Sequence, residues 1–426
     1  MVTQLQHALA GIVTPEMRMV SAMENVDPTW LCQEVAAGRI VIPKNINHQF
    51  NARGIGAGLK TKVNANIGTS EKHCNLAEEM EKLDLAVHHG ADAVMDLSTG
   101  GDLRSILEQI LRVSRVMVGT VPIYSVMAQM LRKGQRVADL NPDVLFAEIE
   151  MQAMMGVDFM TLHCGITKTS LSFLSNTDRV CGVVSRGGAL IKRWMTDNNK
   201  ENPLYEQYDR VLDICAKYDV TISLGDGLRP GAGADATDRA QVAELLVLGE
   251  LVERARKRGV QVMVEGPGHM PADQIPGNMM LMKRVCADAP LYVLGPLTTD
   301  AAPGYDHIVG AIGGTIAAMN GANFLCYVTP AEHLCLPTLE DVRTGVIASR
   351  IAAQSADSIK GIGGARERDY AISKARRELD WNGMYNNALD PEMARMRRNA
   401  SESSNEDTCS MCGNLCAVKN DQEAMA

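Results

Sequence analysis

Short apolar runs alternate with longer helical stretches from residue 63 onward, and this alternation constrains the fold more than any other feature. Repeated strand and helix units predict a parallel sheet, and so many units favour a (β/α)8 barrel over an open, doubly wound sheet. We therefore predict an α/β barrel in which one run lies outside the sheet. The nine runs are residues 63–68, 93–97, 116–121, 159–163, 182–185, 221–225, 261–265, 292–295 and 323–328.

Segments of a different character flank the predicted barrel. The N-terminal lobe contains a helical pattern over 28–38 and a short apolar run at 40–43, whereas long helical patterns follow the barrel. Residues 401–408 are polar and low in hydrophobicity, which predicts a flexible tether. The predicted division is an N-terminal lobe 1–62, the barrel 63–348, a helical C-terminal lobe 349–400, and the tether with a cysteine motif 401–426.

Composition bounds the partners and the compartment. The chain has 426 residues, of which 46% are hydrophobic and 22% charged, so it can bury a large core. A formal net charge of -9 disfavours nucleic acid as a partner. Because we find neither a signal peptide nor a membrane-spanning run, we expect a cytoplasmic protein without a membrane partner, whose eleven cysteines are reduced thiols.

Polar residues follow or close the predicted strands, where a barrel places its catalytic groups. Single polar strand ends often only cap helices, but so many in succession indicate a binding site. Ser185, Arg186, Gly187 and Gly188 together offer a hydroxyl, a guanidinium and backbone amides that suit a phosphate. Other candidates at strand ends are Asn64, Asn66, Met95, Asp96, Tyr124, His163, Glu265, Tyr292 and Glu332.

Two further pairs of residues carry chemistry of their own. Asp226 and Arg229 place a carboxylate and a guanidinium on one turn, which suits ribose hydroxyls or an amine but also describes a plain salt bridge. His269 and His333 each close a different unit and could bind a divalent metal. Each could equally be a hydrogen-bonded structural histidine. Glu265 and Glu332 could complete the coordination or act as acid–base groups.

Three thiols within eight residues, Cys409, Cys412 and Cys416, form the strongest local motif. Three thiolates can hold three irons of a [4Fe-4S] cluster and leave the fourth open for S-adenosylmethionine (SAM). The alternative is a structural zinc site, which normally closes four ligands. No cysteine follows Cys416 and no histidine follows His333, so the cluster is favoured.

Several long motifs make the chain resemble the radical SAM thiamin pyrimidine synthase (ThiC) family from about Gly38 to Lys419. They are KVNANIG, MDLSTG, GTVPIY, VVSRGG, SLGDGLRPG, VMVEGPGH, LGPLTTD, APGYDH, LCYVTPAEHL and CSMCG. The resemblance implies a (β/α)8 barrel, a homodimer, an electron donor that reduces the cluster, and a cluster-bearing tail that closes an active site.

The resemblance also implies the roles of individual residues. His269 and His333 are expected to hold zinc or iron, and Glu265, His163 and Tyr292 to act in catalysis. Cys409, Cys412 and Cys416 are expected to bind the cluster, although their C-x2-C-x3-C spacing is shorter than the usual C-x2-C-x4-C of the family. The residues expected to contact 5-aminoimidazole ribotide are Asn66, Met95, Tyr124, His163, Ser185, Arg186, Gly187, Asp226, Gly227, Leu228, Arg229, Glu265 and Tyr292.

Departures from the family pattern bear on the product. Cys335 stands where the family usually has glycine, Gln354 where it has histidine, and Ala301–Ala302 where it has Ile-Ala. We take these changes, beside intact phosphate and ribose motifs, to indicate the related 5-hydroxybenzimidazole synthases, which supply the lower ligand of cobamides. The alternative is phosphomethylpyrimidine synthesis for thiamine, with the same substrate.

Both readings imply a carbon–carbon lyase that cleaves SAM to a 5′-deoxyadenosyl radical, which abstracts hydrogen from the bound ribose. Two readings from other classes stay open. One is a metal-dependent barrel lyase or hydrolase with a structural zinc tail. The other is a nucleotide-sensing barrel that binds the ribotide without turnover.

Overall fold

The computed structural model describes residues 2–176, 178–400 and 407–425. The chain divides into two compact units, Met1–Ala356 and Asp357–Ala426. A single helix, α15 (Leu339–Lys360), runs through the lobe boundary predicted at residues 348 and 349, and the units part inside this helix. In the part of the chain described, no helix combines the length and apolar character that crossing a bilayer requires.

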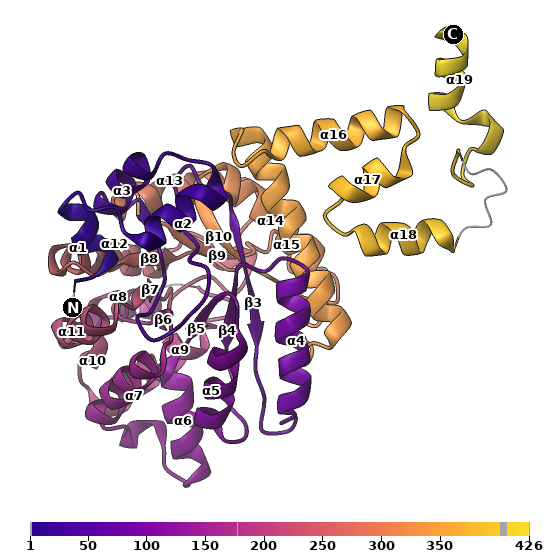
Figure 1. Ribbon diagram of the computed structural model, residues 1–426. Coiled ribbons are helices and arrows are strands. Elements are labelled where there is room, and N and C mark those ends of the chain that lie inside the picture. Colours follow the sequence, from indigo (N-terminus) through magenta and orange to yellow (C-terminus); the bar gives the residue numbers. More distant parts are fainter. Residues whose placement is uncertain (1, 177, 401–406, 426) are drawn as a thin grey trace. The chain divides into compact units, whose positions relative to one another are not determined.

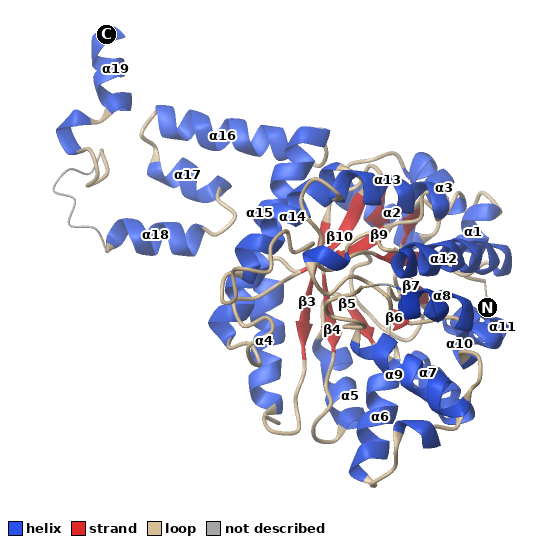
Figure 2. Ribbon diagram, turned by 180° about the vertical axis from the view of Figure 1, so that it is seen from behind, coloured by secondary structure: helices blue, strands red, loops and turns tan. Residues whose placement is uncertain are grey.

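Eight parallel strands close into a barrel in the order β10-β3-β4-β5-β6-β7-β8-β9 (Figures 1 and 2), which confirms the predicted fold class. The register sets Asn66 beside Met95 and Glu265 beside Tyr292, so these side chains lie at the same end of the sheet. The strands are β3 (Lys62–Ile67), β4 (Ala93–Asp96), β5 (Met117–Thr120), β6 (Phe159–Leu162), β7 (Thr221–Leu224), β8 (Val262–Glu265), β9 (Leu291–Leu294) and β10 (Ala322–Cys326).

The ninth apolar run, residues 182–185, is not a strand. It forms the loop that enters helix α9 (Arg186–Asn198), and Ser185 caps that helix by accepting a hydrogen bond from the Gly188 amide at 3.2 Å. The preceding helix, α8 (Lys168–Ser172), is only five residues long, so no full strand–helix unit separates this run from β6.

Amphipathic helices surround the barrel. In α5 the buried residues Leu103, Ile106, Leu107, Ile110 and Leu111 follow the helical period and join the main core. The other helices between strands are α4 (Leu76–His88), α6 (Pro122–Arg132), α7 (Pro142–Met155), α10 (Pro203–Glu206), α11 (Tyr208–Tyr218), α12 (Arg239–Arg258), α13 (Ile275–Val285) and α14 (Asp306–Met319), with 3-10 turns η1 (Val137–Asp139), η2 (Phe173–Asn176) and η3 (Gly233–Asp235).

The N-terminal segment has a small core of its own, in which Met17, Leu31, Val35 and Ile40 are fully buried. The helix predicted over 28–38 ends at Ala36. The elements are α1 (Gln4–Leu9), α2 (Pro15–Glu24), α3 (Pro28–Ala36), β1 (Ile40–Val41) and its antiparallel partner β2 (Ile55–Gly56).

The second unit is helical, with α16 (Ala365–Arg377), α17 (Trp381–Asn387), α18 (Pro391–Asn399), the turn η4 (Gly413–Leu415) and α19 (Ala417–Met425). Residues 401–406 of the predicted tether lie outside the described residues. Its last two residues are held by this unit. Trp381 Nε1 donates to the Asp407 carbonyl at 3.2 Å, and Arg398 donates to the Thr408 carbonyl at 2.8 Å. The Arg398 guanidinium lies 3.9 Å from the Trp381 ring centroid.

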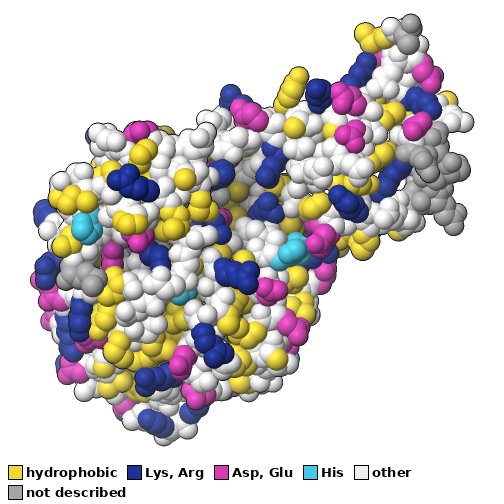
Figure 3. All heavy atoms as spheres, viewed as in Figure 1, with side chains coloured by type: hydrophobic (Ala, Val, Ile, Leu, Met, Phe, Trp, Pro, Cys, Tyr) yellow, Lys and Arg dark blue, Asp and Glu magenta, His cyan; other side chains and the backbone are white. Residues whose placement is uncertain are grey.

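Acidic and basic side chains are interspersed on the face shown in Figure 3. Among the described residues, several acidic and basic side chains form exposed pairs within or between helices, such as Arg258 with Asp213 at 2.6 Å and Arg210 with Asp143 at 2.6 Å. Each such exposed pair contributes little to stability. Because acidic side chains lie among the basic ones, the face in Figure 3 has no broad basic surface.

Candidate active site

A cavity of about 460 Å³ opens at the C-terminal ends of the barrel strands. Most of the predicted site residues line it, although they come from widely separated parts of the chain. They are Asn66, Met95, Tyr124, His163, Ser185, Arg186, Asp226, Arg229, Glu265, His269, Tyr292, Glu332 and His333. Three of the residues assigned to the ribotide do not line the cavity themselves: Gly187 lies in the first turn of α9, and Gly227 and Leu228 lie in the turn after β7. The strand-end candidates Asn64 and Asp96, and Gly188 of α9, do not line it either.

The predicted phosphate-binding residues lie at the N-terminus of α9. Ser185 Oγ caps this helix and also lies 3.0 Å from Nε2 of His163. A Cβ atom at Gly187 would come within 2.2 Å of the His163 ring, so only glycine fits this close approach. Arg186 stacks on Tyr124, with its guanidinium carbon 4.8 Å from the ring centroid. The helix terminus, the hydroxyl and the guanidinium together form a site suited to an anion.

Asp226 and Arg229 face the cavity from the turn after β7. Their side chains form an ion pair at 3.3 Å, and the Arg229 amide donates to the Asp226 carbonyl at 3.1 Å to close the turn. Burial raises the pKa of Asp226 well above its usual range, although the charge of Arg229 opposes this shift. The pair therefore has both an acceptor and a donor to offer a polar ligand.

Glu265, at the end of β8, is held by two hydroxyl groups. Its Oε1 accepts from Thr161 at 2.6 Å and from Ser223 at 3.0 Å. Burial raises the pKa of Glu265, while the Thr161 hydrogen bond and the charge of Arg229 partly offset that effect. A fixed, buried carboxyl of this kind is suited to acid–base chemistry.

His163 is neutral under all ordinary conditions. Burial, with a smaller contribution from the charge of Arg229, lowers the pKa of its imidazole to about 3. A neutral ring can accept at one nitrogen and donate at the other. In the ligand-free site His163 is therefore a neutral hydrogen-bonding group.

A polar network joins residues of β3, β4, β9 and β10 at the cavity. Asn64 donates to Tyr292 Oη at 2.8 Å, and Tyr292 donates to Met95 Sδ at 3.4 Å. Asn66 donates to Cys326 Sγ at 3.2 Å. The network fixes the Tyr292 hydroxyl, which belongs to one of the predicted catalytic residues.

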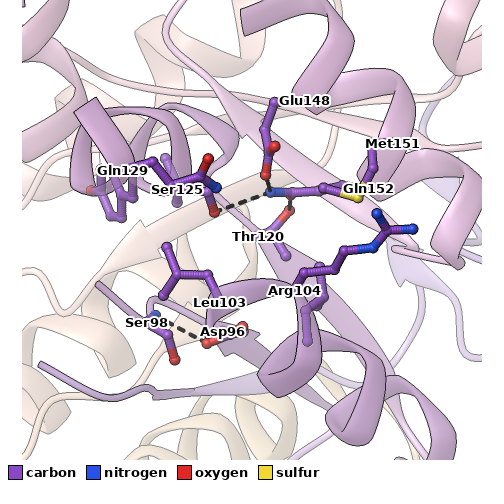
Figure 4. Close-up of a pocket in the computed structure, with 13 residues that line it drawn as sticks. Asp96, Ser98, Leu103, Arg104, Thr120, Ser125, Gln129, Glu148, Met151 and Gln152 are labelled. Atoms are coloured by element: carbon purple, nitrogen blue, oxygen red, sulfur yellow. Dashed lines mark hydrogen bonds between the residues drawn. The ribbon is translucent and has the colours of Figure 1, made fainter. Parts of the chain in front are cut away.

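A second, smaller compartment measures about 20 Å³ and shares Val121 and Tyr124 with the large cavity. Figure 4 shows polar side chains that line it, among them Thr120, Glu148 and Gln152. In it, Gln152 accepts from Thr120 at 2.6 Å and donates to Glu148 at 2.7 Å. Burial raises the pKa of Asp96, which was predicted at a strand end, to about 6. The compartment has room for about one water molecule, so it does not accommodate an organic ligand. Its hydrogen-bonded side chains support the part of the cavity wall that contains Tyr124.

The two predicted metal ligands come together. The rings of His269 and His333 have centroids 5.2 Å apart. Nδ1 of His269 lies 2.6 Å from Asp300, and Nδ1 of His333 lies 3.7 Å from Asp306. The carboxylate that binds Nδ1 of His269 leaves Nε2 of that ring for a metal, as second-shell partners do in metal sites, so this pair of histidines fits a divalent ion. Among the described residues, the two histidines do not belong to a group of three or more Asp, Glu, His or Cys whose ligand atoms all lie within 4.8 Å of one another.

The cysteine motif belongs to the second unit. Cys409 and Cys416 are half-buried and Cys412 is exposed. Backbone amides of Met411 and Cys412 donate hydrogen bonds that lower the pKa of Cys409 and favour its thiolate. Thiolates that accept amide hydrogen bonds suit an iron–sulfur cluster, so the motif fits the group for which it was predicted.

Sequence reasoning did not identify several residues that shape the cavity. Thr161 and Ser223 lie two positions before His163 and Gly225, and the strand period of two could have found them. Cys326 ends β10 and lines the cavity, although it was treated as one of the scattered thiols. Asp300, which orients His269, and Asp306, which lies near His333, carry no signal that links them to a metal site.

A closed (β/α)8 barrel with a polar cavity at its strand ends, joined to a separate three-cysteine motif, defines the class of a radical SAM barrel enzyme. The model of the radical SAM ThiC family matches residues 3–423. The chain belongs to this family, and family membership implies a [4Fe-4S] cluster and SAM.

Curated relatives are similar over nearly their whole length. The chain is 57% identical to a phosphomethylpyrimidine synthase of Carboxydothermus hydrogenoformans over 98% of this chain and 97% of the relative. It is 56% identical to that of a Thermoanaerobacter species and 52% identical to that of Syntrophus aciditrophicus, over 98% of this chain and 97% and 98% of the relatives. A solved dihydropteroate synthase from Coxiella burnetii gives a TM-score of only 0.42 at 10% identity, over 74% of this chain and 99% of that one.

Proposed function

We propose that this enzyme is a phosphomethylpyrimidine synthase, which converts 5-aminoimidazole ribotide to a phosphorylated pyrimidine for thiamine biosynthesis. The observation that carries the proposal is the large cavity, which gathers the residues assigned to the ribotide by family resemblance. The names of relatives that are 52% to 57% identical favour this product over 5-hydroxybenzimidazole.

The departures that favoured 5-hydroxybenzimidazole do not line the cavity. Cys335 is exposed, and neither Gln354 nor the pair Ala301–Ala302 is among the lining residues. A side chain that does not reach the ligand has little leverage on which bonds rearrange. These positions are therefore weak evidence for a different product.

The ribotide is expected to lie with its phosphate at the N-terminus of α9, where Ser185, Arg186 and the Gly187 amide offer donors. Asp226 and Arg229 then face the ribose hydroxyls. Glu265 and Tyr292 face the imidazole ring, where a buried carboxyl and a phenol can exchange protons with ring nitrogens and substituents. His163 holds the Ser185 hydroxyl and accepts or donates a hydrogen bond without changing charge.

Three groups that the chain would bind complete the proposal. Cys409, Cys412 and Cys416 would hold the [4Fe-4S] cluster, which, once reduced by an electron donor, supplies the electron that cleaves SAM to a 5′-deoxyadenosyl radical. His269 and His333 would hold a divalent ion, zinc or iron, beside Glu332. Asp300 orients the imidazole of His269 through a contact of 2.6 Å, and Asp306 lies 3.7 Å from Nδ1 of His333.

Product analysis tests this assignment. We expect incubation with aminoimidazole ribotide, SAM and dithionite to give a phosphorylated pyrimidine, detected by mass spectrometry, without release of inorganic phosphate from the ribotide. The pyrimidine product retains the phosphate bound at α9. A fluorescent hydroxylated benzimidazole together with free phosphate would instead establish the benzimidazole reaction.

We also propose a homodimer. Tyr305 and, along one face of α14, Ile308, Ile312 and Met319 are 42% to 63% exposed, an apolar strip of the kind found at subunit interfaces. We expect sedimentation equilibrium to show dimers at micromolar concentration, and replacing Ile308 and Ile312 with Lys to shift the protein towards monomers. A parent protein that is monomeric and fully active would refute the proposal.

A further inference from the structure

A second small cavity, called the rear cavity below, adjoins the large one on the side of helix α12. This rear cavity measures about 20 Å³, enough for about one water molecule. Asp226, Arg229 and Glu265 line both cavities, whereas Glu244 of α12 lines only the rear one. Glu244 is therefore an acidic group that reaches the ligand only through its neighbours.

Glu244 holds the turn that carries Asp226 and Arg229. Its side chain is buried, and Oε2 accepts a hydrogen bond from the Leu228 amide at 2.7 Å. The nearby Gly227 amide also favours the charged form of this carboxyl. A buried acceptor that binds a backbone amide fixes the backbone of the turn, so Glu244 is a positioning residue for the ion pair in the large cavity.

The carboxyls of Asp226 and Glu244 each have one oxygen that these hydrogen bonds do not use. Asp226 Oδ2 and Glu244 Oε1 are buried and have no hydrogen-bond partner among the described residues. Leaving such atoms unsatisfied costs free energy, so they call for a proton, a water molecule or a cation. A metal cation is disfavoured, because the acidic residues of the rear cavity do not form a group whose ligand atoms lie within 4.8 Å of one another in the described part of the chain.

We propose that Glu244 stores a proton and passes it to Asp226 through one water molecule in the rear cavity, which makes Asp226 a proton donor to the ligand. In this step Glu244 Oε1 gives its proton to the water, and the water gives one of its own to Asp226 Oδ2. Glu244 is left as a carboxylate that the amides of the turn stabilise. No electrons are transferred. The identity of the ligand rests on the proposed function, whereas the stored proton does not.

The surrounding charges support a proton at this position. The charged groups near Glu244 are Asp226, Glu265, Arg229 and Arg179, and the Arg179 guanidinium is already bound to Asp238 at 2.6 Å. If Glu244, Asp226 and Glu265 were all ionised, three buried carboxylates would face the one guanidinium that is not bound to Asp238, that of Arg229. Burial accordingly raises the pKa of Glu244 to about 8 against the opposing effect of the Leu228 amide.

The test compares Glu244→Gln with Glu244→Ala. The glutamine carbonyl can accept from the Leu228 amide and its NH2 can donate to the water, as a protonated carboxyl does, but it cannot release a proton. We expect E244Q to bind aminoimidazole ribotide within about twofold of the parent near pH 7, while its turnover falls about tenfold or more. E244A should lose about tenfold in affinity as well, because the turn loses its acceptor. The exposed Glu253→Gln on the same helix is the matched control and should change neither.

A measurement without ligand separates this inference from the proposed function. We expect the parent-minus-E244Q infrared difference spectrum near neutral pH to contain the carbonyl absorption of a protonated carboxylic acid, and this band to be lost as the pH rises above about 8. If the ribotide does not bind but this absorption behaves as expected, the proposed substrate fails and the stored proton stands. Equal infrared spectra for parent and E244Q, or E244Q binding as weakly as E244A, would overturn the inference.

Discussion

Replacing any one of Cys409, Cys412 and Cys416 with alanine is expected to abolish formation of 5′-deoxyadenosine. A cluster that uses three thiolates and leaves one iron for SAM needs all three cysteines of the motif. Liquid chromatography of anaerobic reactions measures the loss, and iron and sulfide analysis should show about four of each per parent chain and far fewer in each variant.

The matched control is Cys74→Ala, which removes an exposed thiol outside the motif. We expect this variant to retain both the cluster and its activity. Tightly bound zinc without labile sulfide in the parent, with activity that survives the loss of Cys412, would contradict the assignment and favour the structural zinc tail.

Replacing Glu265 with glutamine is expected to lower turnover by about a hundredfold while changing ribotide affinity little. The substitution keeps the size of the side chain and its contacts with Thr161 and Ser223, but removes the carboxyl proton chemistry. Single-turnover product formation and calorimetric binding measure the two effects separately.

Thr161→Val is the companion variant, because it keeps the carboxyl and removes one donor. The Thr161 hydrogen bond lowers the pKa of Glu265, so its loss lets that pKa rise further. If the reaction needs the carboxylate, the acidic limb of the rate profile should move to higher pH, and activity should fall by only about tenfold at neutral pH. A T161V profile that does not move, together with an E265Q variant of normal turnover, would remove Glu265 from the chemistry.

The barrel could be predicted from the sequence because the alternation of strands and helices repeats along most of the chain. Which of the nine runs lies outside the sheet could not be predicted, for an equally physical reason. Gly182, Val183 and Val184 have the composition of a strand, but Ser185 opens a helix immediately afterwards, and the five-residue α8 is too short to form a complete unit after β6. Periodicity alone cannot separate a short apolar loop from a short buried strand.

The cavity could be predicted in large part for a different reason. Parallel strands of a barrel bring their C-terminal ends together, so polar residues at those ends must meet even when they are far apart in sequence. Glu244 could not be found in this way, because it lies on the long helix α12 and acts from behind the turn at Asp226. No local pattern distinguishes it from the exposed acidic residues of the same helix, such as Glu253.

Deuterium transfer tests the central claim most directly, namely that a radical generated from SAM acts on a ribotide bound in the barrel cavity. Ribotide deuterated on the ribose, incubated with the reconstituted protein, SAM and dithionite, is predicted to yield 5′-deoxyadenosine that carries deuterium, as measured by mass spectrometry. Arg229→Ala, which removes a cavity donor but not the cysteine motif, should greatly reduce the transfer. Undeuterated 5′-deoxyadenosine, formed at the same rate with and without ribotide, would contradict the account.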